Sequence, residues 1–180
     1  MFDEAYFKKY IATIPGFPKP GIMFRDVTPT TENPEAFKAA IDGMAEIASK
    51  VEFDKIICGE ARGFLFGAAL GYKMGKGVVC ARKPGKLPRP GYSYSYTLEY
   101  GQSTLIISEG SIKEGERCLI VDDLIGTGGT AVAMMKLVEM SKAIPVMALF
   151  YVGLPDLKGD EVIKKENDIP VHSLVDFEGE

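Results

Sequence analysis

The stretch at residues 117–131 reads RCLIVDDLIGTGGTA and contains the signals that decide the fold. Its apolar, partly β-branched run at residues 118–121 predicts a short buried strand. Asp122 and Asp123 follow where this strand is expected to end, and residues 126–130 form a turn of glycines and threonines. A helical pattern starts at Ala131. The order of strand, acids, turn and helix therefore indicates an α/β unit with a polar site between its strand and its helix.

This arrangement suits a phosphorylated sugar. Backbone N–H groups of the turn and of the helix N-terminus bind phosphate, while the two carboxylates bind sugar hydroxyls. The turn residues expected to bind phosphate are Gly126, Thr127, Gly128, Gly129 and Thr130.

Other interpretations of the turn fit less well. GTGGTA also matches the G-x-G-x-x-A dinucleotide fingerprint, which requires an acid at the end of the next strand, about 20 residues on. The next apolar run, residues 144–152, contains no acid. No Gly-Lys-Ser/Thr follows, so the turn is not a P-loop. A plain turn without a ligand stays open, but such a turn rarely needs two adjacent carboxylates.

The sequence VDDLIGTGGTA resembles the motif with which type I phosphoribosyltransferases bind phosphoribosyl pyrophosphate (PRPP). Within that family the chain looks most like the members that act on adenine. The alternation of strands and helices predicts an α/β fold with a mainly parallel central sheet of about five strands flanked by helices. The resemblance implies a single domain over residues 1–180, with a small N-terminal hood at 1–32, a core at 33–180 and a flexible β-arm lid at 84–108.

Local patterns give the expected elements. Helices are expected at residues 2–14, from Asn33 to Lys50, at 64–72 and at 130–142, and irregular structure at 15–30. Strands are expected at 54–59, at 77–81 and at 144–152, the last in the centre of the sheet, with a final edge strand at 171–177. Period-2 alternation at 92–96 predicts an exposed ribbon that pairs with residues 104–108.

Composition limits the possible classes of protein. The chain has 180 residues, 46% of them hydrophobic and 26% charged, as is ordinary for one soluble domain. No run is long enough for a membrane span, and the start does not resemble a signal peptide. Cys58, Cys80 and Cys118 each lie in an apolar run and are expected to be core residues in a reducing cytoplasm. The net charge of −4 argues against nucleic-acid binding.

Two further segments resemble family motifs for pyrophosphate. Residues 59–64 and the basic loop at 82–88 follow strands, where open α/β sheets bind ligands. Each segment also has an interpretation without a ligand. The first would form an Arg62–Glu60 ion pair, and the second would be a solvated charged loop. The resemblance implies a strained or cis peptide near residue 61. It also implies pyrophosphate contacts from Glu60, Ala61, Arg62, Arg82, Lys83 and Lys86, with one basic residue reaching across a dimer.

The hood segment PGIMFRD resembles the part of the family that covers the base. The resemblance places Met23, Phe24 and Arg25 at adenine, where main-chain groups match its ring acceptor and its 6-amino donor. The alternative interpretation of the same residues is a loop that packs against the core and binds no base. In the arm, YTLEYG resembles the lid tip, which implies that Glu99 is the catalytic acid/base and that Tyr100 steadies the lid.

The implied reaction is adenine + PRPP → AMP + pyrophosphate, with Mg²⁺ as cofactor and with Glu99 and Arg62 as catalytic residues. The resemblance implies that Asp122 and Asp123 hold the ribose, with magnesium contacts through water as a further option, and it implies a homodimer. A phosphoribosyltransferase for a 6-oxo purine, a PRPP or purine sensor, and a sugar-phosphate-binding module stay open. Gly153 and the pair Gly159-Asp160 depart from the family's tail pattern, which affects the base pocket rather than the PRPP site.

Overall fold

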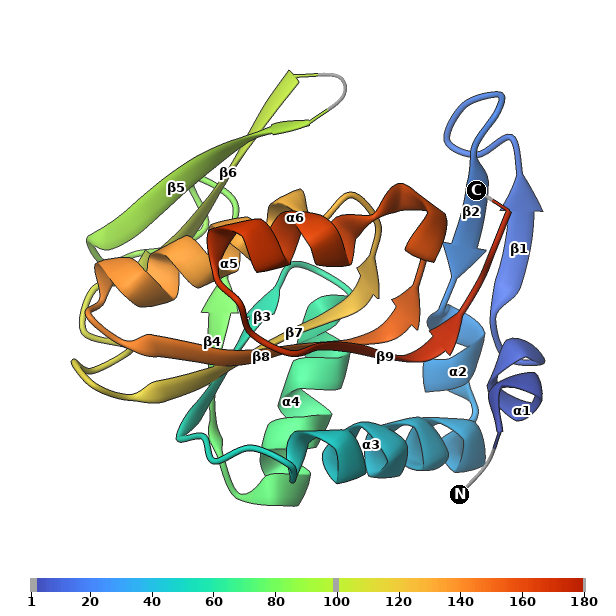
Figure 1. Ribbon diagram of the computed structural model, residues 1–180, viewed down its shortest axis with the longest axis horizontal. Coiled ribbons are helices and arrows are strands. Elements are labelled where there is room, and N and C mark those ends of the chain that lie inside the picture. The colour runs from blue at the N-terminus through green and yellow to red at the C-terminus, as the bar shows by residue number, and fades with distance from the viewer. Residues whose placement is uncertain (1–2, 99–100, 180) are drawn as a thin grey trace.

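A computed structural model describes residues 3–98 and 101–179 of the chain (Figure 1). Its centre is a five-stranded sheet in the order β4-β3-β7-β8-β9, and each neighbouring pair is parallel. The expected parallel α/β sheet of five strands is therefore confirmed. The strands are β3 Lys55–Gly59, β4 Gly77–Ala81, β7 Arg117–Ile125, β8 Ile144–Gly153 and β9 Val171–Asp176.

Helices cover both faces of this sheet (Figure 1). One layer holds α3 Pro34–Ala48 and α4 Gly63–Met74, and the other holds α5 Gly129–Met140 and α6 Gly159–Glu166. The side chains of β7 alternate between the layers, because Leu119 and Val121 pack in the first core cluster and Ile120 packs in the second. The 3₁₀ helix η1 Pro155–Leu157 joins β8 to α6.

The start of α3 follows from its sequence. The side chain of Asn33 accepts a hydrogen bond from the backbone N–H of Ala36, and Pro34 occupies the first turn. Gly75 ends α4 in the left-handed conformation at φ +68°. No helix within residues 3–98 and 101–179 is long and apolar enough to cross a membrane.

The N-terminal hood differs from its prediction. The structure has α1 Glu4–Lys8, the antiparallel strands β1 Ala12–Pro15 and β2 Met23–Asp26, and α2 Thr28–Glu32. The helix expected at 2–14 and the irregular structure expected at 15–30 were thus wrong in part. Ile14, which fitted a helical stripe, is 40% exposed on β1. The hairpin forms because Gly16 and Gly21 adopt positive φ in its turn and allow the two strands to pair.

The β-arm consists of β5 Gly91–Leu98 and β6 Gly101–Ser108, which pair in antiparallel fashion. It is not the exposed ribbon that the alternation predicted. Tyr92, Tyr94 and Tyr96 are half-buried and pack against the second core cluster, which includes α5, while Ser93 and Ser95 face outward. The period-2 pattern separates a helix-facing row of tyrosines from a solvent-facing row of serines.

Three smaller predictions also need correction. Strand β7 continues to Ile125, so Asp122 and Asp123 lie within the strand rather than after it. Strand β8 is interior but β7 occupies the centre of the sheet, whereas β9 is an edge strand as expected. Cys58 and Cys118 are buried, but Cys80 is exposed because β4 is the other edge strand.

Candidate functional site

A cavity of about 390 Å³ lies at the carboxyl ends of β3 and β7. It joins the loop after β3, the acids of β7, the start of α5 and the inner side of the β-arm. Strand ends of parallel sheets are the usual place for ligands in α/β proteins. The residues that line the cavity are Glu60, Ala61, Arg62, Lys83, Tyr96, Ser103, Leu105, Asp122, Asp123, Leu124 and Thr130.

The two acids of β7 occupy different environments. Asp122 is buried, with 8% of its surface exposed, and its Oδ1 accepts the backbone N–H of Asp123 at 2.9 Å. Burial raises the pKa of Asp122 well above its ordinary value, and the charge of Asp123 raises it further. Asp123 forms an ion pair with Arg62, whose Nε lies 2.7 Å from Oδ2. The site therefore presents one charge-compensated carboxylate and one carboxyl group that binds its proton tightly.

The turn at residues 126–130 is a narrow cradle with a cavity of about 190 Å³. Gly128 has φ +87°, and a Cβ on it would lie 2.7 Å from the carbonyl oxygen of Gly159 on α6. Gly129 begins α5, and no side chain among the described residues caps this helix. The backbone N–H groups of the first turn of α5 therefore face the cavity without a side-chain partner and suit an anion.

The loop after β3 brings a cation to the acids. The peptide bond between Glu60 and Ala61 is cis, as the family resemblance implied. Arg62 follows it and points to Asp123, so the alternative Arg62–Glu60 ion pair does not form. Burial lowers the pKa of Arg62, but the charge and the hydrogen bond of Asp123 outweigh this effect, and the net shift is upward. Arg62 is therefore a permanent cation at the cavity wall.

Glu60 connects the cis-peptide loop to the basic loop after β4. Its Oε1 accepts the backbone N–H of Lys83 at 2.8 Å and Nε of Arg82 at 3.0 Å. Burial raises the pKa of Glu60, but these two contacts outweigh it and the net pKa is lowered. Lys83 lines the cavity, whereas Arg82 turns back onto Glu60, and Lys86 is exposed farther along the loop.

The hood residues Met23, Phe24 and Arg25 lie on β2 and are half-buried. The guanidinium of Arg62 lies 5.4 Å from the ring centre of Phe24, which places the hood beside the cis-peptide loop. The side chain of Arg25 donates to Thr13 Oγ1 at 2.6 Å and lies over the ring of Phe177 at 4.5 Å. The side chain of Arg25 is therefore held by partners in the hood and in the tail.

A separate cavity of about 180 Å³ lies on the other side of the cradle, where the sequence departs from the family pattern. Gly153, Asp160 and Asp176 line it, together with His172. Ser173 donates to Asp176 at 2.5 Å.

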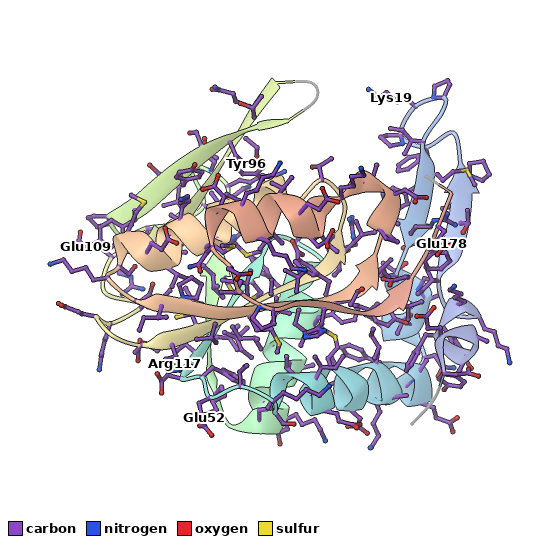
Figure 2. The ribbon with its side chains drawn as sticks, in the orientation of Figure 1. Lys19, Glu52, Tyr96, Glu109, Arg117 and Glu178 are labelled. Atoms are coloured by element: carbon purple, nitrogen blue, oxygen red, sulfur yellow. The ribbon has the colours of Figure 1, made fainter. Side chains whose placement is uncertain are left out.

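The sequence analysis missed four wall residues, Tyr96, Ser103, Leu105 and Leu124. Tyr96 was visible as a member of the tyrosine row, but its contact with Thr130 depends on how the arm folds onto α5. Figure 2 labels Tyr96 at the arm, above α5. The predicted acid/base Glu99 and the predicted lid residue Tyr100 lie outside the described residues.

Comparison with known proteins agrees with this geometry. Residues 30–161 match the family described as phosphoribosyl transferase domain. An adenine phosphoribosyltransferase of Brachyspira hyodysenteriae is 49% identical over 170 residues, which cover 94% of this chain and 98% of that protein.

Solved structures of such enzymes have the same fold. The crystal structure of adenine phosphoribosyltransferase from Thermoanaerobacter pseudethanolicus has a TM-score of 0.91 at 44% identity and covers 96% of this chain and 99% of that chain. The enzyme of Saccharomyces cerevisiae, solved with an imino-altritol bisphosphate and adenine, has a TM-score of 0.87 at 36% identity, with 96% and 98% covered.

Proposed function

This chain belongs to the phosphoribosyltransferase family, and on that basis we propose that it transfers the 5-phosphoribosyl group of PRPP to adenine, giving AMP and pyrophosphate. The observation that carries the proposal is a pair of adjoining cavities, which share Asp122, Leu124 and Thr130 in their walls. One contains the cis-peptide loop and the acids of β7, and the other contains the cradle at 126–130. Relatives named adenine phosphoribosyltransferase match nearly the full length of the chain, so the similarity extends beyond one motif and supports the proposal.

The reaction breaks the bond between the anomeric carbon and pyrophosphate and forms a bond from that carbon to a ring nitrogen of adenine. A proton leaves the base, and pyrophosphate leaves with the bonding electrons. The transition state carries positive charge on the sugar and negative charge on the leaving group. Catalysis therefore needs groups that hold the ribose, stabilise pyrophosphate and accept the proton.

The described residues supply the first two needs. Asp122 and Asp123 bind the ribose hydroxyls, and the first turn of α5 binds the 5′-phosphate. Arg62 and Lys83 face the leaving group directly. Arg82 contributes through Glu60, and Ala61 through its backbone. Lys86 is close enough in sequence to join the pyrophosphate site.

Acceptance of the proton of the base, the third requirement, is assigned to the arm. Glu99 is proposed as the group that accepts the proton of adenine, and Tyr100 as the residue that steadies the closed lid. Exclusion of water by the lid protects PRPP from hydrolysis. Met23, Phe24 and the main chain of Arg25 are proposed to bind adenine, because the Arg25 side chain is engaged with Thr13.

Mg²⁺ is proposed to enter with PRPP. Among the described residues no group of three or more possible ligands is close enough to hold a metal ion by itself. The carboxylate of Asp123 and the carboxyl group of Asp122 offer hard oxygen donors, and Mg²⁺ usually combines one or two such groups with substrate phosphates and water. The residues therefore fit a substrate-borne ion, which neutralises charge on the pyrophosphate.

The proposal includes a cytoplasmic homodimer. The family resemblance implies the dimer, and Leu65 and Tyr72 support it, because they are exposed at 45% and 93% on α4. The three free cysteines fit a reducing compartment. Light scattering on the purified chain tests the dimer, and a monomer at micromolar concentration contradicts it.

One assay tests the function. Purified protein is incubated with PRPP, Mg²⁺ and a single purine base, and nucleotide formation is followed by chromatography. We expect AMP from adenine and no nucleotide from hypoxanthine or guanine, because a main-chain match to the 6-amino group mismatches a 6-oxo group. Preference for a 6-oxo purine contradicts the adenine assignment. No nucleotide from any base, with PRPP still bound, indicates a sensor.

A further inference from the structure

Tyr96 is the arm residue that contacts the phosphate cradle. Its hydroxyl lies 3.3 Å from Thr130 Oγ1, and either oxygen can donate in this hydrogen bond. Its ring lies against Gly129, because a Cβ on that glycine would be 3.2 Å from Cδ2 of Tyr96. The cradle is thus enclosed by α6 at Gly128 and by the arm at Gly129.

Thr130 has a fixed orientation in the first turn of α5. Its methyl carbon faces β3, since a Cβ on Gly59 would lie 3.6 Å from Cγ2 of Thr130. With the methyl group on that side, the hydroxyl points to the cavity and to Tyr96. The only free variable is the direction of the hydroxyl hydrogen.

Phosphate chemistry decides which direction is useful. The oxygens of a phosphate dianion only accept hydrogen bonds, so Thr130 helps the 5′-phosphate only as a donor. A threonine hydroxyl that donates to phosphate still has lone pairs that accept. A phenol is a better donor than an aliphatic hydroxyl, and bonds in such a chain strengthen one another.

Resting on the proposed function, we propose that Tyr96 is a positioning residue of the PRPP site: it donates to Thr130 and so commits the Thr130 hydroxyl hydrogen to the 5′-phosphate. The arm then belongs to the sugar-phosphate half of the site as well as to the base half. Tyr96 acts through Thr130 and not on the reacting atoms. Its loss should weaken PRPP binding and leave the chemical step intact.

The test compares Tyr96→Phe with Tyr94→Phe. Tyr94 is half-buried on the same face of β5, and it does not line the cavity. We expect Tyr96→Phe to raise KM for PRPP about 3- to 10-fold, the cost of one neutral hydrogen bond, with kcat and KM for adenine changed less than about twofold. Tyr94→Phe should leave all three unchanged. An unaltered KM for PRPP in Tyr96→Phe overturns the inference.

A double-mutant cycle separates this role from general packing. Valine at position 130 has no hydroxyl to accept, so Tyr96→Phe should add little to KM for PRPP in a Thr130→Val background. Thr130→Ser keeps the hydroxyl, and Tyr96→Phe should retain its full effect there. The same fold-change in the Val and Ser backgrounds overturns the relay and assigns Tyr96 to packing alone.

Failure of the proposed function gives a different result. A wild-type protein that makes no AMP overturns the adenine transferase activity and leaves the Tyr96 inference testable by calorimetry with ribose 5-phosphate. We then expect Tyr96→Phe to weaken ribose 5-phosphate binding about 3- to 10-fold and Tyr94→Phe to have no effect. Equal affinities of wild type and Tyr96→Phe overturn the inference.

Discussion

Asp122 and Asp123 are adjacent in sequence, but alternation along β7 gives them different partners. Both line the cavity, but Asp123 pairs with Arg62, while Oδ1 of Asp122 lies against the start of α4, where a Cβ on Gly63 would overlap it. A glycine at position 63 is thus required for the buried carboxyl to fit. Both side chains are buried, but the charge of Asp123 is paired with Arg62, whereas no ion pair to Asp122 is found among the described residues. Burial of a charge therefore costs more at Asp122 than at Asp123.

This cost predicts the pH dependence of an Asp122→Asn variant. The pKa of Asp122 is raised in the folded protein, so the folded chain keeps a proton that the unfolded chain loses. Unfolding free energy therefore falls as pH rises from about 4 towards the folded pKa. Asn removes this loss and still accepts the N–H of Asp123. We expect the variant to gain stability relative to wild type as the pH rises above about 4, measured by urea unfolding over a range of pH values.

Asp123→Asn is the control. It removes the ion pair with Arg62, whose side chain is 46% exposed, so the expected loss of unfolding free energy is below about 1 kcal/mol. Both variants should bind PRPP more weakly. A constant stability difference between Asp122→Asn and wild type at all pH values contradicts the assignment of a raised pKa to Asp122.

At the scale of elements, the loops after β3 and β4 act as one unit because Glu60 binds both. We expect Glu60→Ala to release Arg82 and the N–H of Lys83 and to raise KM for pyrophosphate in the reverse reaction about tenfold or more, the cost of charge-assisted hydrogen bonds. KM for adenine should stay unchanged. Steady-state kinetics with AMP and pyrophosphate provides the measurement.

Glu116 offers a matched control for this variant. Its Oε2 accepts the N–H of Lys113 at 2.8 Å and lies 3.0 Å from Nζ of Lys55, the same pattern at the opposite end of the sheet. Each of the two variants, Glu60→Ala and Glu116→Ala, removes two polar contacts and should lower the free energy of unfolding by a similar amount. Glu116→Ala should not change KM for pyrophosphate. If both variants change KM equally, the role of Glu60 is general stability.

The elements that the sequence predicted well are those whose signals are local. Strand β4 matches its prediction, and α3 begins at the predicted Asn33 cap, because apolar runs and caps act within a few residues. The hood hairpin was missed because its strands are held by pairing across a Pro- and Gly-rich turn, which no periodicity reveals. The sequence analysis ended β7 before Asp122, because two adjacent acids are unusual inside a buried strand. The strand in fact continues to Ile125.

Predictions of the site residues divide in the same way, between local sequence signals and contacts that depend on tertiary packing. The motif strand indicated Asp122, Asp123 and the cradle, and the family resemblance indicated the loop at 60–62. The contact between Tyr96 and Thr130 joins residues 34 positions apart and depends on the arm lying on α5. Partners of this kind, including Glu60 with Arg82, follow from tertiary packing and not from spacing.

On the scale of the whole molecule, the hood and the arm stand at opposite ends of the carboxyl edge of the sheet (Figure 1). The hood is joined to the core through Tyr151 of β8. The Tyr151 hydroxyl lies 2.8 Å from Thr30 Oγ1, and Thr30 in turn donates to the carbonyl of Tyr10. The Tyr151 ring stacks on Phe66 of α4 at 5.0 Å. One buried side chain thus links α2 of the hood to α4, which begins at the cis-peptide loop.

We therefore expect Tyr151→Phe to affect adenine more than PRPP. The ring and its stacking remain, and Thr30 keeps its bond to Tyr10, so the loss of unfolding free energy should be about 0.5–1.5 kcal/mol. The hood loses one attachment to the sheet, so KM for adenine should rise while KM for PRPP stays constant. Urea unfolding and steady-state kinetics measure the two effects. An equal rise of both KM values in Tyr151→Phe would show that this link serves the fold as a whole and not the base site.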